Sequence, residues 1–226
     1  MDCIIGIDVG GTSVKIGKFY NGKLIEDIAI PTDTTNKGAN IIPSIIETVK
    51  TFATNDQIIG IGVGLPGPVV EGNLLAAHNL GLENLDAQQV FEEAFPTVCV
   101  RITNDANAAT LGEQKKGGGM GYRDLVFVTL GTGIGGGVII QDHLLEGYSG
   151  SAGEIGHVRV DFQNKRKCTC GLYDCVEEYA SATGIVKTAL EKIAQFQIQT
   201  LLTQEVLTSK YIFECAKKGD ILALQV

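Results

Sequence analysis

One segment of the sequence carries a histidine and three cysteines at spacings typical of a metal site. His157 is followed by Cys168, Cys170 and Cys175. Three thiolates and one imidazole form a ligand set that closes a structural zinc site. The alternative is a loop with free thiols, since two cysteines separated by one residue are poorly placed for a mutual disulfide. The segment therefore predicts a structural Zn²⁺ bound by these four residues.

Two glutamates flank this predicted metal site. Glu154 precedes the histidine by three residues, and Glu177 follows the last cysteine by two. A loop stiffened by a metal would hold both carboxylates in fixed positions, where they can accept hydrogen bonds from sugar hydroxyls. The Lys165-Arg166-Lys167 run beside the cysteines is expected to be a solvated face.

Two glycine-rich turns between apolar segments indicate phosphate binding. Glycine lets backbone N–H groups approach a phosphate, a hydroxyl and a lysine can add to the contact, and an aspartate can hold Mg²⁺ through water. An ordinary tight hairpin explains either turn alone, but two of them favour a nucleotide cleft between two lobes. The first turn contains Asp8, Gly10, Gly11, Thr12 and Lys15, and the second contains Gly131, Thr132 and Gly133.

Asp105 is the candidate catalytic base. It follows an apolar segment and Asn104, and a helix is expected to begin at Ala106. A base at this point would deprotonate a substrate hydroxyl as that hydroxyl attacks the γ-phosphorus of a nucleotide. The alternative is that Asp105 only caps the helix, a role in which aspartate is common.

The elements expected around these residues alternate between strands and helices. Two strand–turn–strand units, each with a glycine-rich turn, imply two similar α/β lobes, residues 1–112 and 113–226. From Cys175 onward the chain is expected to be mostly helical. Strands are expected at 3–8, 13–20, 23–30, 58–64, 98–102, 125–130 and 138–140, and helices at 41–52, 87–94 and 209–219.

Composition limits the classes of function. The 226 residues carry a net charge of −8 and a pI near 4.9, which argues against a general affinity for nucleic acid. No apolar run reaches membrane-spanning length, and the N-terminus lacks the features of a signal peptide. A soluble cytoplasmic protein without a membrane partner is expected. The cysteines outside the cluster, Cys3, Cys99 and Cys215, are then expected to be thiols.

The end of the sequence falls inside an element. The helix that starts near Ser209 is expected to close at Gly219, and Asp220 is expected to start a new helix. The sequence ends at Val226, within two turns of that start, where an amphipathic helix cannot bury its face. A C-terminal portion is therefore expected to be missing.

Together these motifs resemble the ROK family of sugar kinases and repressors, within the sugar kinase/Hsp70/actin superfold. Asp8-x-Gly-Gly-Thr-x-x-Lys15 resembles the first phosphate motif of the family, and Gly131-Thr-Gly133 resembles the second. The loops with Gly67 and Asn79 resemble those that line its sugar pocket. The resemblance implies a two-lobed, actin-like or ribonuclease H-like α/β ATPase fold with an interlobe cleft.

The resemblance also implies a reaction and its residues. The γ-phosphoryl of ATP, bound with Mg²⁺, would pass to the 6-hydroxyl of a hexose, with Asp105 as base and His157 serving both Zn²⁺ and sugar. Val158-Arg-Val-Asp161 and Ala180-Ser-Ala-Thr-Gly184 look like the glucokinases of the family, which favours glucose. The implied sugar contacts are Gly67, Asn79, Asn104, Asp105, Glu154, His157 and Glu177.

Other members of the family leave alternatives open. N-acetylmannosamine, fructose and allose are alternative substrates, and a non-catalytic sugar-sensing regulator is an alternative function. The regulator is disfavoured because the first strand starts at Cys3, which leaves no room for a helix-turn-helix. The resemblance further implies a homodimer or homotetramer. One departure from the family is Asp174, where glycine is usual; if the position needs a positive φ, aspartate tolerates it better than most residues.

Overall fold

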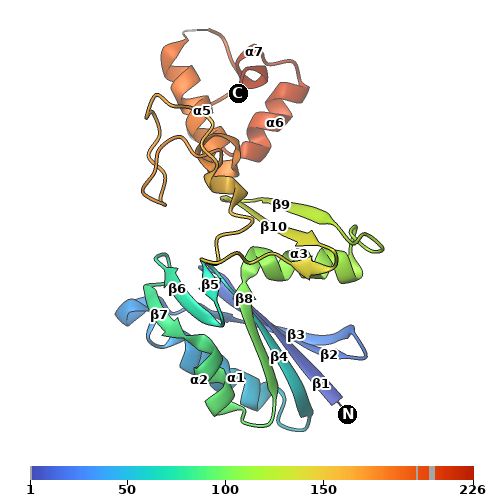
Figure 1. Cartoon of the computed structure of the whole chain (residues 1–226). Coiled ribbons are helices and arrows are strands. Elements are labelled where there is room, and N and C mark those ends of the chain that lie inside the picture. The colour runs from blue at the N-terminus through green and yellow to red at the C-terminus, as the bar shows by residue number, and fades with distance from the viewer. Residues whose placement is uncertain (1, 197, 204–206) are drawn as a thin grey trace. The chain divides into compact units, whose positions relative to one another are not determined.

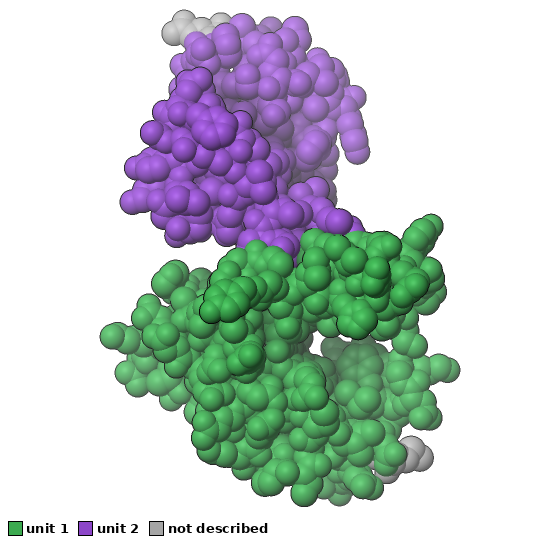
Figure 2. Space-filling view, viewed as in Figure 1, with its two compact units in different colours: residues 1–125, 137–152 green, residues 126–136, 153–226 purple. Residues whose placement is uncertain are grey.

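The computed structural model describes residues 2–196, 198–203 and 207–226. The chain forms two compact units (Figure 2). Unit 1 comprises Met1–Leu125 and Gly137–Ala152, and unit 2 comprises Val126–Gly136 and Gly153–Val226. The expected division into lobes near Gly112 stays a prediction. No helix among the described residues is long and apolar enough to cross a membrane.

Unit 1 is built on a five-stranded sheet with the order β3-β2-β1-β4-β8 (Figure 1). β1 pairs antiparallel with β2 and parallel with β4, which pairs parallel with β8. Alternate residues of β1 are buried, as expected for a strand with one face against a core. The strands are β1 (Asp2–Val9), β2 (Ser13–Tyr20), β3 (Lys23–Pro31), β4 (Gln57–Leu65) and β8 (Cys99–Asn104).

Two amphipathic helices, α1 (Ile41–Phe52) and α2 (Ala87–Ala94), complete the core of this sheet (Figure 1). Ile45 of α1 and Phe91 of α2 are both fully buried against the strands. The predicted positions of both helices are confirmed, and the prediction of α1 rested on the helical spacing of its apolar residues. A short helical turn, η1 (Thr35–Gly38), precedes α1.

A small antiparallel sheet that the sequence did not reveal follows β4. Its order is β5-β6-β7, with β5 (Val69–Val70), β6 (Asn73–Ala77) and β7 (Leu82–Asp86). These strands have two to five residues, too few for a clear alternating pattern. They support the loop of Gly67, whose position leaves no room for a Cβ beside the carbonyl of Ala76.

A third sheet has the order β11-β10-β9 and follows α3 (Asp105–Lys116). β9 is Leu125–Leu130, β10 is Ile134–Ile140 and β11 is His143–Leu144. The prediction that this second strand starts at Val138 was wrong, because β10 includes the preceding glycines. A Cβ on Gly136 would lie 2.8 Å from the Gly153 carbonyl oxygen, so these glycines permit close packing rather than a long turn.

The C-terminal part of unit 2 is helical, as predicted. Helices α5 (Ala182–Gln195), α6 (Ser209–Lys217) and α7 (Ile221–Leu224) enclose a small core that includes Ala189, Ile212 and Leu222 (Figure 1). The helix predicted from Ser209 is confirmed, and Asp220 is the N-cap of α7, accepting from the Ala223 amide. Two short elements precede them, η2 (Ile155–His157) and α4 (Glu177–Ala180).

Candidate functional site

The carboxyl ends of three parallel strands bring the predicted catalytic residues of unit 1 to one edge of its sheet. In the register, Asp8 of β1 lies beside Gly64 of β4, and Gly64 lies beside Thr103 of β8. Asp105 comes two residues later, at the start of α3. A Cβ on Gly64 would lie 3.3 Å from the Cα of Asp105, so the missing side chain lets α3 approach this edge.

Asn104, rather than Asp105, is the N-cap of α3. Its side-chain oxygen accepts from the Asn107 amide at 3.1 Å, and its amide nitrogen donates to the Gly67 carbonyl at 3.1 Å. The interpretation of Asp105 as the cap was therefore wrong, since the capping position is one residue earlier. The Asp105 side chain remains exposed and accepts from the next amide, that of Ala106, at 2.8 Å.

Desolvation raises the pKa of the Asp105 carboxyl above its ordinary value, and the charge of Asp8 raises it further. The hydrogen bond from Ala106 acts in the opposite direction. The residue is exposed to solvent, yet nearby protein atoms desolvate its carboxyl. A carboxylate with a raised pKa is a stronger base, which suits proton abstraction from a hydroxyl.

The first glycine-rich turn joins β1 to β2 beside this edge. Gly10 donates its amide to the Ser13 carbonyl at 3.0 Å, and a Cβ on Gly10 would lie 2.9 Å from that oxygen. The predicted sugar residue Asn79 reaches this turn, since a Cβ on Gly11 would lie 3.5 Å from its Nδ2. Lys15 lies opposite Asp8 in the register, both exposed, as an oppositely charged cross-strand pair. The Thr12 carbonyl accepts from the Thr32 amide.

The four predicted metal ligands converge in unit 2. One ligand atom from each of His157, Cys168, Cys170 and Cys175 lies within 4.8 Å of the other three. The Cys168 Sγ is 3.5 Å from the His157 Nδ1, and the Cys170 and Cys175 sulfurs are 3.7 Å apart, well beyond a disulfide bond. These residues fit a tetrahedral Zn²⁺ in number, chemistry and convergence.

Burial makes this cluster dependent on a cation. Desolvation raises the pKa of the Cys175 thiol to about 12, and it also raises the pKa of Cys168. Both side chains are at most 2% exposed. Thiols gathered in such a place ionise readily only when a positive charge offsets the loss of water, as a bound divalent metal does.

His157 divides its two ring nitrogens between the metal ligands and a carboxylate. Nδ1 faces Cys168, whereas Nε2 lies 3.8 Å from the Glu154 Oε2. Glu154 precedes η2 and His157 is its last residue. The element packs closely, since a Cβ on Gly156 would clash with the Ile134 carbonyl. This arrangement places a predicted metal ligand and a predicted sugar ligand side by side.

Glu177 begins α4 and contacts the second glycine-rich turn. Its Oε2 accepts from the Ile134 amide at 2.8 Å. A Cβ on Gly133 would come within contact distance of the same carboxylate oxygen, so the two residues are close neighbours. The predicted sugar and phosphate residues of unit 2 are therefore in direct contact. Unit 1 holds Asp8, the first turn, Gly67, Asn79, Asn104 and Asp105, and unit 2 holds Glu154, His157, Glu177, Gly131, Thr132 and Gly133.

A sequence model of the ROK family matches residues 4–226. The chain belongs to the ROK family. A glucokinase of Halalkalibacterium halodurans is 36% identical over 98% of this chain and 71% of its own length. The crystal structure of a ROK glucokinase from Streptomyces griseus, in complex with glucose and AMPPNP, is 30% identical with a TM-score of 0.76, covering 99% of this chain and 73% of that one.

ROK relatives also include regulators of transcription. A xylose repressor of Caldicellulosiruptor bescii is 31% identical over 96% of this chain and 57% of its own length. The mixed α/β, actin-like ATPase fold predicted from the sequence is confirmed by the ROK sugar kinases among the similar structures.

Two residues of this ROK chain hold the metal segment through contacts that the sequence did not predict. Arg166, expected on a solvated face, is only 8% exposed, and its guanidinium donates to Glu191 and Thr188 of α5. That expectation was wrong, because these partners come from a helix distant in sequence. Asp174 is fully buried with φ +59°, the positive value anticipated for it. Tyr179 donates its hydroxyl to Asp174 at 2.8 Å.

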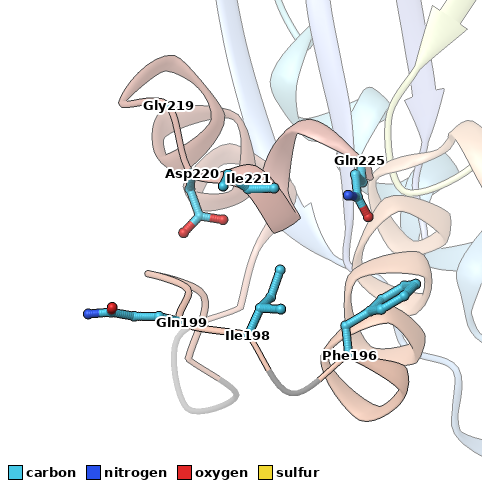
Figure 3. Close-up of a pocket in the computed structure, with 7 residues that line it drawn as sticks. All are labelled: Phe196, Ile198, Gln199, Gly219, Asp220, Ile221 and Gln225. Atoms are coloured by element: carbon cyan, nitrogen blue, oxygen red, sulfur yellow. The ribbon is translucent and has the colours of Figure 1, made fainter.

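A surface pocket is present in unit 2 (Figure 3). Its lining residues come from α7, from the residues flanking α7, and from residues 196, 198 and 199, which follow α5. None of the predicted site residues contributes to it. It is lined by Phe196, Ile198, Gln199, Gly219, Asp220, Ile221 and Gln225.

Proposed function

We propose that this ROK protein is a sugar kinase that transfers the γ-phosphoryl of ATP to the 6-hydroxyl of a hexose, with glucose the first candidate. Curated relatives named glucokinase, 32–36% identical over at least 98% of the chain, support the reaction and the substrate. The observation that carries the proposal is Asp105, an exposed carboxylate of raised pKa at the sheet edge that also bears Asp8.

Asp105 acts as the general base. It takes the proton of the sugar 6-hydroxyl as that oxygen attacks the γ-phosphorus, and ADP leaves with the pair of electrons of the broken P–O bond. Asn104 orients the start of α3 and the Gly67 loop through its two hydrogen bonds. Asp8 would hold Mg²⁺ through water, and the ion neutralises phosphate charge when bound.

Glu154, His157 and Glu177 bind the sugar hydroxyls. Their positions depend on the segment that carries His157, Cys168, Cys170 and Cys175, which would hold Zn²⁺. The metal would supply structural rigidity and fix the His157 tautomer, with Nδ1 on the cation side and Nε2 on the sugar side. Both glycine-rich turns contact the phosphates of ATP. The residues involved are Gly10, Gly11, Thr12 and Lys15 of the first turn and Gly131, Thr132 and Gly133 of the second.

Replacement of Asp105 tests the proposal. Asp105→Asn keeps the size of the side chain and its bond to Ala106 but removes the base. We expect kcat for glucose phosphorylation to fall at least about 100-fold, while the glucose Kd changes less than about threefold. ADP release across a panel of hexoses measures the first quantity, and calorimetry measures the second.

Asp86→Asn is the matched control. Asp86 also precedes a helix of unit 1, where it caps α2 by accepting from the Gln89 amide at 2.9 Å, and asparagine caps equally well. This control should retain wild-type kcat. Full activity of Asp105→Asn would show that another group is the base.

A sugar-responsive regulator is the second candidate, favoured by the similarity to the xylose repressor. Binding of a sugar without phosphorylation of any hexose in the panel, in the presence of Mg·ATP, would support it over the kinase.

A further inference from the structure

The second glycine-rich turn is fastened to the N-terminus of α5 by two consecutive carbonyls. The Gly131 carbonyl accepts from the Ala182 amide at 2.9 Å, and the Thr132 carbonyl accepts from the Thr183 hydroxyl at 2.8 Å. Ala182 is the first residue of α5, so its amide has no partner within the helix. The turn supplies that partner and is itself fixed.

Occupied carbonyls determine where the next amides point. In a trans peptide the C=O and the following N–H point in opposite directions, and the described chain contains no cis peptide. Because the Gly131 and Thr132 carbonyls both face α5, the Thr132 and Gly133 N–H groups both point away from it. Two successive amides aimed to one side form the kind of concavity that binds an anion.

The next amide along the turn is already used. The Ile134 N–H donates to the Glu177 carboxylate, which also occupies the space beside Gly133. The pair of amides available for an anion is therefore limited to Thr132 and Gly133. A polar chain supports the geometry, since Ser181 Oγ lies 3.0 Å from the Thr183 hydroxyl and accepts from the Gly184 amide.

We infer that Thr183 is a positioning residue for nucleotide phosphate: its hydroxyl holds the Thr132 peptide so that the Thr132 and Gly133 amides donate to a phosphate oxygen of ATP. This inference rests on the proposed kinase function and names a residue outside the glycine motif. It also means that the segment after the metal ligands serves the phosphate turn as well as the sugar.

Thr183→Val and Thr183→Ser test the inference. Valine keeps the shape of the side chain but loses the hydroxyl, whereas serine keeps the hydroxyl. We expect Thr183→Val to raise the Kd of Mg·AMPPNP about threefold to fivefold, the effect of one partly exposed hydrogen bond, with the glucose Kd unchanged. Thr183→Ser should restore wild-type affinity. Calorimetry measures both ligands on each variant.

Hydrogen exchange supplies a second measurement that does not depend on activity. Amides of residues 131–134 should exchange faster in Thr183→Val than in Thr183→Ser, because the turn is released from α5. Thr51→Val is the control, since the Thr51 hydroxyl donates to the Glu47 carbonyl within α1, outside the proposed site. If Thr183→Val unfolds, Thr183→Ala replaces it.

Unchanged AMPPNP affinity in Thr183→Val would overturn the inference, and so would an equal loss in Thr51→Val or an equal loss of glucose affinity. The failure of the proposed function has a different signature. In that case the wild-type protein itself neither binds AMPPNP nor phosphorylates a hexose, and the phosphate role falls with it.

Discussion

The core of unit 1 and the metal-ligand segment of unit 2, residues 153–177, hold their functional side chains by different means. The sheet of unit 1 places Asp8 and Asp105 at its edge through continuous strand pairing over buried aliphatic residues. Residues 153–177 contain one short helical turn, two isolated β-bridges and the first residue of α4. Large apolar side chains there, such as Phe162 and Leu172, are exposed.

The difference shows where the stability of each region resides. The sheet distributes it over many apolar contacts, each of modest value. The metal-ligand segment holds its backbone through the buried polar groups of Arg166 and Asp174, and a bound metal would add the linkage between its four predicted ligands. Single substitutions in the segment should therefore change metal binding and sugar contacts together, whereas those in the core should change only the free energy of unfolding.

The largest expected effect comes from loss of one metal ligand. Cys175→Ser should reduce bound zinc from about one ion per chain to near zero, because four-coordinate structural sites depend on every ligand. The glucose Kd should rise at least about tenfold, since His157 and Glu177 lose their support. Elemental analysis and calorimetry measure the two quantities. Cys215→Ser, an equally buried cysteine of unit 2 apart from the cluster, should retain the metal.

A smaller effect should follow from a cavity in the core. Ile45→Ala removes a fully buried side chain of α1 and should lower the free energy of unfolding by about 3 kcal/mol. Urea denaturation gives this value, and zinc content should stay at the wild-type level. Ile25→Ala, at a side chain that is 61% exposed, should cost less than about 0.5 kcal/mol. Loss of zinc in Ile45→Ala would contradict the claim that substitutions in the core of unit 1 change only the free energy of unfolding.

The smallest effect concerns pH. Asp56 accepts hydrogen bonds from Tyr20 and Lys18, and both lower its pKa below the ordinary value. The bond from Tyr20 has the larger effect. A carboxyl with a lowered folded-state pKa stabilises above its unfolded pKa of about 3.9, and this stability is lost as pH falls through the folded value. Asp56→Asn should thus lower Tm at pH 7 and lower it less near pH 3.

Tyr20→Phe provides the companion to this measurement. It removes the Tyr20 hydrogen bond but leaves the Lys18 ion pair. The decrease in Tm should therefore depend on pH in the same direction as in Asp56→Asn, but it should be smaller. Thermal melts of both variants across pH 3–7 measure it. An Asp56→Asn effect that is equal at both ends of the range would contradict the assigned pKa direction.

The sequence predicted elements with strong periodicity and residues with local chemistry. Helices α1 and α2 and the strands around the first turn could be located because their apolar patterns are long. The convergence of His157 with the cysteines followed from ligand type and spacing alone. The assignment of each residue to sugar, phosphate or base stays a prediction.

What the sequence could not provide depends on contacts between distant segments. Arg166 finds its partners 22 to 25 residues later, and Glu177 finds Ile134 43 residues earlier. A one-residue difference in the position of a cap, from Asp105 to Asn104, lies within the usual uncertainty of a helix start. Strands β5 to β7 are too short to carry a period.

The close approach of glycines in unit 2 constrains how this protein can diverge. A Cβ on Gly184 would lie 2.8 Å from the carbonyl oxygens of Glu177 and Glu178, so α5 rests directly on the backbone of α4. Any larger residue there would displace α5, and Thr183 with it, from the turn at Thr132. A Cβ on Gly133 would instead meet the Glu177 carboxylate, a side-chain end that can move. A substitution at Gly184 would need compensating substitutions elsewhere. Homologues that lack this glycine should therefore also differ in how they hold the phosphate turn.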